Sequence, residues 1–186
     1  MRRFTANDYR VMPWKNGGGT TTELYVEAGA GLSFLWRVSI AEVAAVGPFS
    51  IFGGFDRHIM AIEGLGMVLD GGPNGPIDVN PRFVPRSFSG DWPIISRLIA
   101  GPVRDFNLMA RRDSVESSLS CIEVTDMLQL GGEPGVTTFA YLLEGELEAG
   151  GERLMAGESL LLAPGEMAKG SSSAVRLALC RIRALG

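Results

Sequence analysis

Short apolar runs, many of them alternating with polar residues, follow one another along the chain, and Gly, Pro, Asp and Asn separate them. A period of two is typical of strands with one buried face, and glycine and proline between such runs favour turns. In the first part of the chain we expect strands over residues 32–40, 57–64, 66–71, 93–101 and 103–110. Similar runs continue to the C-terminus, so the pattern predicts an all-β fold, a sandwich or a barrel.

Helix signals are scarce. The best helical candidate is "SIAEVAAV" (Ser39–Val46), where alanine and glutamate favour helix. It could form only about two turns before Gly47 and Pro48 end it. One short helical candidate does not change the all-β prediction.

A polar segment, Arg111–Ser120, is the best candidate for a domain boundary. The segments "AIEGLGMVLDG" before it and "LLEGELEAGGERLMAGESLLLAPGE" after it both have a strand ending in Glu-Gly, a hairpin and another strand. This weak internal repeat predicts two related barrels, residues 1–113 and 114–186.

Composition narrows the function classes. The 186-residue chain is 46% hydrophobic and 20% charged, and its net charge is −4 with no long basic block, so a nucleic-acid partner is not expected. Its aliphatic runs are too short to span a bilayer, and no apolar segment follows the N-terminal arginines, so we expect a cytoplasmic protein without a membrane partner. Cys121 and Cys180 are expected to be reduced and to act as small hydrophobic residues.

Two expected strands carry polar residues on one face. In "WRVSI", Arg37 and Ser39 lie opposite the apolar residues, and in "VRDFNLM", Asp105 and Asn107 point the same way. Such a face is either solvated or lines a polar lumen, and the pattern alone leaves both open. An arginine can bind a carboxylate in a bidentate manner, and an asparagine can both donate and accept hydrogen bonds.

The stretch "PWKNGGGTTTE" is followed by a strand, since "TTTELYV" is β-branched. It lacks the Gly-Lys-Ser/Thr of a phosphate-binding loop and the glycine spacing of a dinucleotide fingerprint. The glycines could let backbone N–H groups converge on a ligand, or form a turn that lets Trp14 fold onto the barrel. Local sequence alone favours the turn.

Metal chemistry is not expected. The region around "GELEAGGERLMAGESLLLAPGE" has the strand–turn–strand rhythm of a cupin barrel, but the histidines of metal-binding cupins are missing. The one histidine of the chain, His58, lies among apolar neighbours and is expected to be structural. We predict neither a metal nor a cofactor.

"PWKNGGGTTTE", "WRVSIAEVAAVGPFSIFGGFDRH", "IEGLGMVLDG", "FSGDW" and "GPVRDFNLMARR" together resemble the HutD/Ves family over most of residues 13–112. The resemblance implies a bicupin, two packed cupin-type (double-stranded β-helix or jelly-roll) barrels in one chain, without the usual metal histidines. Members often accompany bacterial histidine-utilisation genes, and others are linked with environmental stress. It also implies a pocket in the N-terminal barrel for an acidic intermediate such as formylglutamate.

With this resemblance the ligand-loop interpretation moves ahead of the turn. The predicted ligand-binding residues are Lys15, Asn16, Gly17, Gly18, Gly19, Thr20, Arg37, Ser39, Asp56, Arg57, Phe88, Asp105 and Asn107. The favoured function is non-enzymatic binding of a small carboxylate or polar metabolite that tunes histidine utilisation. The alternatives are a metal-free isomerase or hydrolase, with Asp105 or Asp56 as general base, and a scaffold for protein contacts. A homodimer is expected from fold analogy alone.

Overall fold

The computed structural model describes residues 1–14, 17–29, 31–171 and 174–186. Its strands pair in antiparallel fashion throughout the described register, so the all-β prediction is confirmed. The chain divides into two compact units, one formed by Met1–Tyr9 with Val115–Gly186 and the other by Arg10–Ser114. Within the described residues, no helix has the length and apolar character that a membrane crossing requires.

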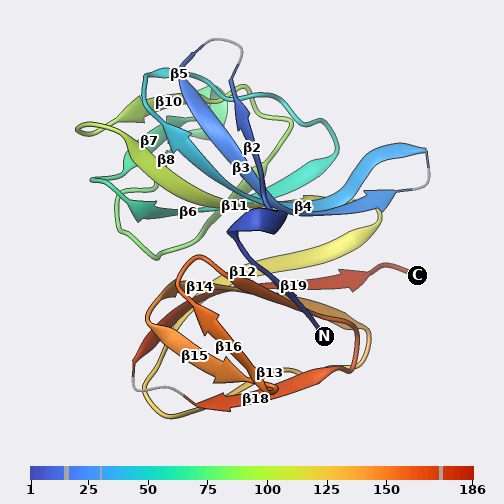
Figure 1. Ribbon diagram of the computed structural model, residues 1–186. Helices are drawn as coiled ribbons and strands as arrows, with labels where there is room; N and C mark the ends of the chain where they lie inside the picture. Colours follow the sequence, from blue (N-terminus) through green and yellow to red (C-terminus); the bar gives the residue numbers. More distant parts are fainter. Residues whose placement is uncertain (15–16, 30, 172–173) are drawn as a thin grey trace. The chain divides into compact units, whose positions relative to one another are not determined.

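The unit Arg10–Ser114 contains two sheets (Figure 1). Its larger sheet has the strand order β2-β3-β4-β11-β6-β9, and its smaller sheet has the order β5-β10-β7-β8. The bounds are β2 (Arg10–Pro13), β3 (Gly19–Gly29), β4 (Leu32–Val43), β5 (Gly47–Pro48), β6 (Phe55–Glu63), β7 (Met67–Asp70), β8 (Pro76–Asp78), β9 (Arg86–Ser89), β10 (Ile95–Leu98) and β11 (Val103–Arg111), with a 3-10 turn at Gly72–Asn74.

The core of this unit draws on both of its sheets. Val43 and Ile59 from the larger sheet and Met67 and Leu69 from the smaller one belong to a single cluster of buried side chains. Since each sheet can bury only one of its faces against the other, apolar residues gather there.

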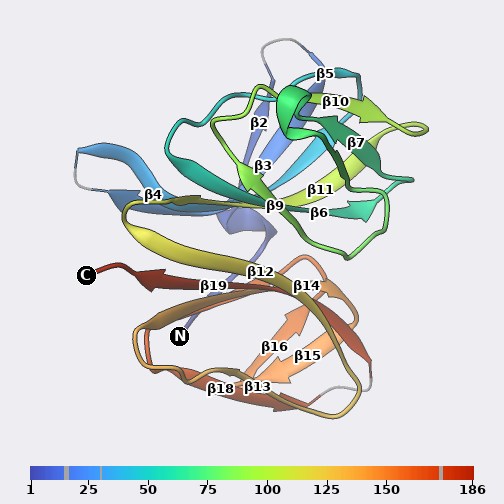
Figure 2. The same ribbon diagram turned by 180° about the vertical axis from the view of Figure 1, so that it is seen from behind.

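The other unit also has two sheets. They have the orders β1-β17-β14-β19-β12 and β13-β18-β15-β16. The bounds are β1 (Arg2–Phe4), β12 (Val115–Val124), β13 (Met127–Gly131), β14 (Val136–Glu144), β15 (Glu146–Ala149), β16 (Glu152–Met155), β17 (Ser159–Leu162), β18 (Met167–Ser171) and β19 (Val175–Ala184), with a 3-10 turn at Ala6–Asp8. Figure 2 shows the same strands from behind. A buried leucine- and alanine-rich cluster again joins both sheets.

The N-terminus belongs to this second unit, whereas the sequence pattern placed residues 1–9 with the rest of residues 1–113. The reason is strand pairing: β1 adds to the edge of β17, with Arg3 opposite Leu160. Arg3 also donates a hydrogen bond to Glu158 at 2.8 Å, and the first nine residues therefore lie with the C-terminal part of the chain.

The candidate helix Ser39–Val46 does not form. Residues up to Val43 continue β4, because this segment pairs with β3 on one side and β11 on the other. The tertiary pairing overrides a weak local preference for helix. The cysteines are free, and the register sets Cys121 opposite Ala178 and Cys180 opposite Leu119, so they are not cross-strand partners.

The glycine run allows a close approach at the start of β3. A Cβ added to Gly19 would lie 2.1 Å from the Glu42 carbonyl oxygen and 3.1 Å from the Trp14 ring. The backbone N–H of Trp14 donates to the Gly19 carbonyl at 2.9 Å, and the backbone N–H of Gly17 donates to the Trp14 carbonyl at 3.1 Å. The run thus holds Trp14 against the start of the sheet.

We expect Gly19→Ala to lower the free energy of unfolding by about 1–3 kcal/mol, because a backbone oxygen blocks the new methyl group and β3 must shift. Gly47→Ala is the matched control, since a Cβ there meets nothing within 4 Å. Urea denaturation of both variants measures the difference. Equal stability of the two would contradict the close packing at Gly19.

Candidate functional site

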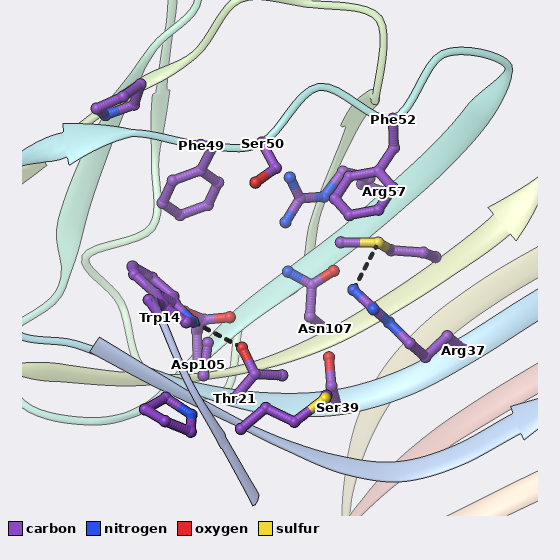
Figure 3. A pocket seen from close by; sticks show the side chains of 15 residues that line it. Trp14, Thr21, Arg37, Ser39, Phe49, Ser50, Phe52, Arg57, Asp105 and Asn107 are labelled. Atoms are coloured by element: carbon purple, nitrogen blue, oxygen red, sulfur yellow. Dashed lines mark hydrogen bonds between the residues drawn. The ribbon is translucent and has the colours of Figure 1, made fainter. Parts of the chain in front are cut away.

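The unit Arg10–Ser114 contains a cavity of about 780 Å³, a size typical of small-molecule sites. Figure 3 shows loop residues Phe49, Ser50 and Phe52 on one side and strand residues Ser39, Asp105 and Asn107 on the other. The lining residues are Met12, Pro13, Trp14, Thr21, Arg37, Ser39, Ala41, Pro48, Phe49, Ser50, Phe52, Arg57, Asp105, Asn107 and Met109.

Strand β11 positions the polar part of this lining. It lies between β4 and β6, and residues directly opposite each other on paired strands share a face of the sheet. The register forms three rows on the cavity face: Arg37–Met109–Arg57, Ser39–Asn107–Ile59 and Ala41–Asp105–Ala61. The alternation of β4 and β11 therefore brings together polar residues from distant parts of the chain.

Arg57 is buried, with 5% of its surface exposed. Its guanidinium carbon lies 5.1 Å from the ring centroids of Phe49 and Phe88 and 5.8 Å from that of Phe52. Burial lowers the pKa of Arg57 to about 10, so it stays positively charged at neutral pH. Its Nε is buried and has no hydrogen-bond partner among the described residues.

Arg37 lies at the other side of Met109 and is partly buried. Its Nη2 donates a weak hydrogen bond to the Met109 sulfur at 3.4 Å, and its guanidinium carbon lies 5.2 Å from the Phe34 ring and 5.4 Å from the Phe52 ring. Desolvation lowers the pKa of Arg37, which the charge of Glu23 partly offsets. The buried Nε of Arg37 also lacks a partner in the described part of the chain.

Asp105 is completely buried. Burial raises the pKa of its carboxyl to about 7, although the positive charge of Arg57 and the nearby Asn107 side chain favour the ionised form. Across the residues that the structure describes, neither Asp105 oxygen has a hydrogen-bond partner, and no ion pair within 4.0 Å joins this carboxyl to an arginine. The Asn107 side-chain oxygen is likewise buried without a partner in those residues.

Unpartnered polar atoms are the distinctive property of this cavity. Each buried donor or acceptor without a partner costs about 1–3 kcal/mol, and such atoms are rare in native proteins. Within the described ranges, all those found on side chains belong to Arg37, Arg57, Asp105 and Asn107. A ligand carrying both acceptors and donors would satisfy them.

The donor set does not fit a metal ion. Two guanidinium groups repel a cation, and a single carboxylate with one amide oxygen supplies too few ligands. In the described part of the chain, no group of three or more His, Cys, Asp or Glu side chains gathers in one place.

The predicted glycine loop lies beside the cavity rather than in its lining. Gly17, Gly18, Gly19 and Thr20 do not line it, and the predicted Lys15 and Asn16 fall outside the described residues. Residues on either side of the glycines do line the cavity. The Trp14 indole N–H donates to the Thr21 hydroxyl at 2.8 Å, and both of these side chains belong to the lining.

Three further residues named from the sequence also lie outside the lining. Asp56 accepts a hydrogen bond from Arg112 at 2.7 Å, and Phe88 contributes only through its ring beside Arg57. His58 lies 2.7 Å from the Ser87 hydroxyl, and burial lowers its pKa.

Part of the lining was not predicted from the sequence. Met109 lies four residues after Asp105 on the same strand face, so the alternation that indicated Asp105 and Asn107 could have included it. Thr21 could have been found by extending the alternation from the strand that follows the glycines. Ala41 and Ser50 carry no local signal, because only the strand register and the loop fold bring them to the cavity.

Comparison with known proteins supports a common family. The family model HutD matches residues 6–179. An uncharacterised 21.2 kDa protein in the hutC 3′ region of Pseudomonas putida is 40% identical over 131 residues, which are 69% of this chain and 67% of that protein. Protein Ves of Citrobacter koseri is 34% identical over 153 residues, 80% of this chain and 78% of that one.

Solved structures show the same architecture. HutD from Pseudomonas fluorescens SBW25, solved in a formate condition, has a TM-score of 0.84 and 33% identity, covering 100% of this chain and 99% of that chain. Oxalate decarboxylase from Lactobacillus farciminis has a TM-score of 0.68 and 9% identity, covering 97% and 85%, and shares the fold alone. The predicted bicupin fold class is thereby confirmed.

The raised pKa of Asp105 predicts a pH-dependent stability. A carboxyl whose pKa rises from 3.8 to about 7 on folding stabilises the protein below its unfolded pKa, and this contribution is lost as the pH rises through about 7. Asp105→Asn cannot ionise. We therefore expect its free energy of unfolding relative to wild type to increase between about pH 4 and about pH 8, by at most about 4 kcal/mol at about 1.36 kcal/mol per pKa unit.

Denaturant titrations of both proteins across this pH range measure the effect. A difference that stays constant with pH would mean that Asp105 titrates as an ordinary exposed carboxyl.

Proposed function

The chain belongs to the HutD family, and from this membership and the cavity chemistry we propose that it binds a small carboxylate metabolite and thereby tunes histidine utilisation. The observation that carries this proposal is a pair of arginines at the same cavity, the buried Arg57 and the partly buried Arg37, each with a buried and unpartnered Nε. Guanidinium groups are suited to bidentate binding of a carboxylate, and such charge-assisted hydrogen bonds are strong when buried.

The positions of the arginines support a ligand anion between them. They occupy one row of the sheet on either side of Met109. Burial lowers the pKa of Arg57, and the like charge of Arg37 lowers it further. A bound carboxylate would relieve this repulsion. It would also supply the acceptors that both Nε atoms lack.

A metabolite of histidine breakdown such as formylglutamate fits these requirements. It has carboxylates for the arginines and an amide N–H and formyl oxygen for the other polar groups of the lining. The HutD relative was solved in a formate condition, and formate is the simplest one-carbon carboxylate. The relative in the hutC 3′ region supports the link with histidine utilisation.

Arg37→Ala tests the proposal, because Arg37 is the less buried of the two arginines and its removal leaves Arg57 beside Asp105. We expect formylglutamate affinity to fall at least tenfold, about 1.4 kcal/mol, while the free energy of unfolding changes by less than about 1 kcal/mol. Isothermal titration calorimetry measures the affinity.

The matched control for this experiment is Arg97→Ala, which removes an exposed arginine paired with Asp70 at 3.0 Å. Its affinity should equal that of wild type. Unchanged binding by Arg37→Ala, or a wild type that binds none of the small carboxylates of histidine breakdown, would contradict the proposal.

A second candidate function, metal-free acid–base catalysis, is favoured by Asp105 alone. A buried carboxyl with a pKa of about 7 inside a cavity is suited to exchange protons at neutral pH. In that case Asp105 would be the general base of an isomerase or hydrolase acting on a small polar metabolite.

This second candidate predicts turnover that depends on the carboxylate. Incubation of wild type with formylglutamate and related carboxylates, followed by NMR, should show a product, and Asp105→Asn should slow its formation at least a hundredfold. Absence of any product, or equal rates in the two proteins, would leave binding as the function.

A further inference from the structure

The acceptor side of the cavity is as unusual as its arginines. Both Asp105 oxygens and the Asn107 side-chain oxygen are buried without hydrogen-bond partners among the described residues. The two residues are separated by one position on β11 and therefore point to the same face. These three unpartnered acceptor atoms thus belong to two residues that both line the cavity.

The neighbouring strands do not cover the Asp105 carboxyl. In the register, the residues on either side of it are Ala41 and Ala61, whose side chains are short and carry no polar atoms. A larger polar residue at either position could have donated a hydrogen bond. The two alanines instead leave Asp105 without a polar residue directly opposite it on either adjacent strand, and Asp105, Asn107 and Ala41 all line the cavity.

In the part of the chain that the structure describes, the two arginines do not form an ion pair with the Asp105 carboxyl. Arg57 acts on Asp105 electrostatically, yet the described residues contain no ion pair within 4.0 Å between Asp105 and either arginine. Within the described ranges, guanidinium donors and a carboxylate acceptor therefore line one cavity without an ion pair between them. A ligand that satisfies both must have an anionic end and a hydrogen-bond donor.

We propose that Asp105, assisted by Asn107, is the residue that determines ligand specificity, and that it selects carboxylates carrying an N–H group, such as N-acylamino acids, over carboxylates without one. This inference rests on the proposed function, because the same ligand must place its carboxylate at Arg37 and Arg57. The N–H donates to Asp105, and the acyl carbonyl is free to accept from hydroxyl groups of the lining.

Two physical effects produce the selection. A ligand with CH2 in place of N–H leaves buried acceptors unpaired, and sites built to bind a donor reject such analogues strongly. A ligand with a second anionic group at this position would face the Asp105 carboxylate in a desolvated cavity, where like charges repel more than in water.

Hydrogen bonding to ionised Asp105 also makes binding pH-dependent. Burial sets the pKa of free Asp105 near 7, and an N–H donor would lower it, so affinity should decrease as the pH falls below about 7. Arg57 on β6 has a pKa of about 10, and Arg37 on β4, influenced by Glu23 on β3, also remains charged in this range. His58 on β6 forms a hydrogen bond with the Ser87 hydroxyl. Burial lowers the pKa of His58, and the negative charge of Asp56 partly offsets this decrease.

The direct test compares formylglutamate with 2-(2-oxoethyl)pentanedioate, the same molecule with CH2 in place of the N–H. Calorimetry on wild type should give at least a tenfold preference for formylglutamate. In Asp105→Asn the preference should shrink to about threefold or less, while the CH2 analogue still binds, because Arg37 and Arg57 remain. Asp70→Asn, which removes an exposed carboxylate paired with Arg97, is the matched control and should keep the wild-type preference.

The outcomes separate the two proposals. Equal binding of the two ligands by wild type, or an undiminished preference in Asp105→Asn, would overturn the specificity role and leave carboxylate binding intact. Binding of neither ligand would overturn the specificity role, and failure of the other small carboxylates of histidine breakdown to bind as well would overturn both proposals.

The pH dependence of binding can be measured on the wild-type protein alone. For wild type, formylglutamate affinity should fall by up to about tenfold per pH unit below about pH 7. Affinity that increases toward acidic pH would mean that protonated Asp105 donates to the ligand, which contradicts the inference. If Asp105→Asn does not fold, the ligand pair and the pH profile of wild type decide the question.

Discussion

The pairing of β11 with β4 on one side and β6 on the other is the constraint on which the cavity depends. Opposite residues of paired strands share a face, so this register places Arg37, Arg57, Asp105 and Asn107 around one space. A slip of one residue in β11 would turn Asp105 and Asn107 to the other face and bring Phe106 and Leu108 into the cavity. The burial of those two side chains opposes such a slip and holds the polar residues in place.

The same arrangement imposes a cost on the folded state. Burial lowers the pKa values of Arg37 and Arg57 and raises that of Asp105, which means that each charged form is less stable than it would be in water. A protein selected for stability alone would replace such groups or pair them fully. Their retention as unpartnered atoms around an aromatic-lined space is typical of a preorganised binding site, in which the ligand completes the hydrogen bonds.

Part of this site could be predicted from the sequence. Period-two alternation set Arg37 with Ser39 and Asp105 with Asn107, and the structure brings all four to the cavity. The pattern could not give the strand register, which joins residues far apart in the chain, nor the edge pairing that assigns β1 to the C-terminal unit. Gly19 has no side chain, and this leaves room for the Trp14 ring. A glycine run that serves such packing looks the same in sequence as one that binds a ligand.

The most direct test of ligand binding in this cavity is an experimental structure of the protein with formylglutamate. We expect a ligand carboxylate within hydrogen-bonding distance of Nε of both Arg37 and Arg57, and the ligand N–H directed at Asp105. Ligand bound elsewhere, or bound in the cavity with these atoms still unpartnered, would contradict this expectation.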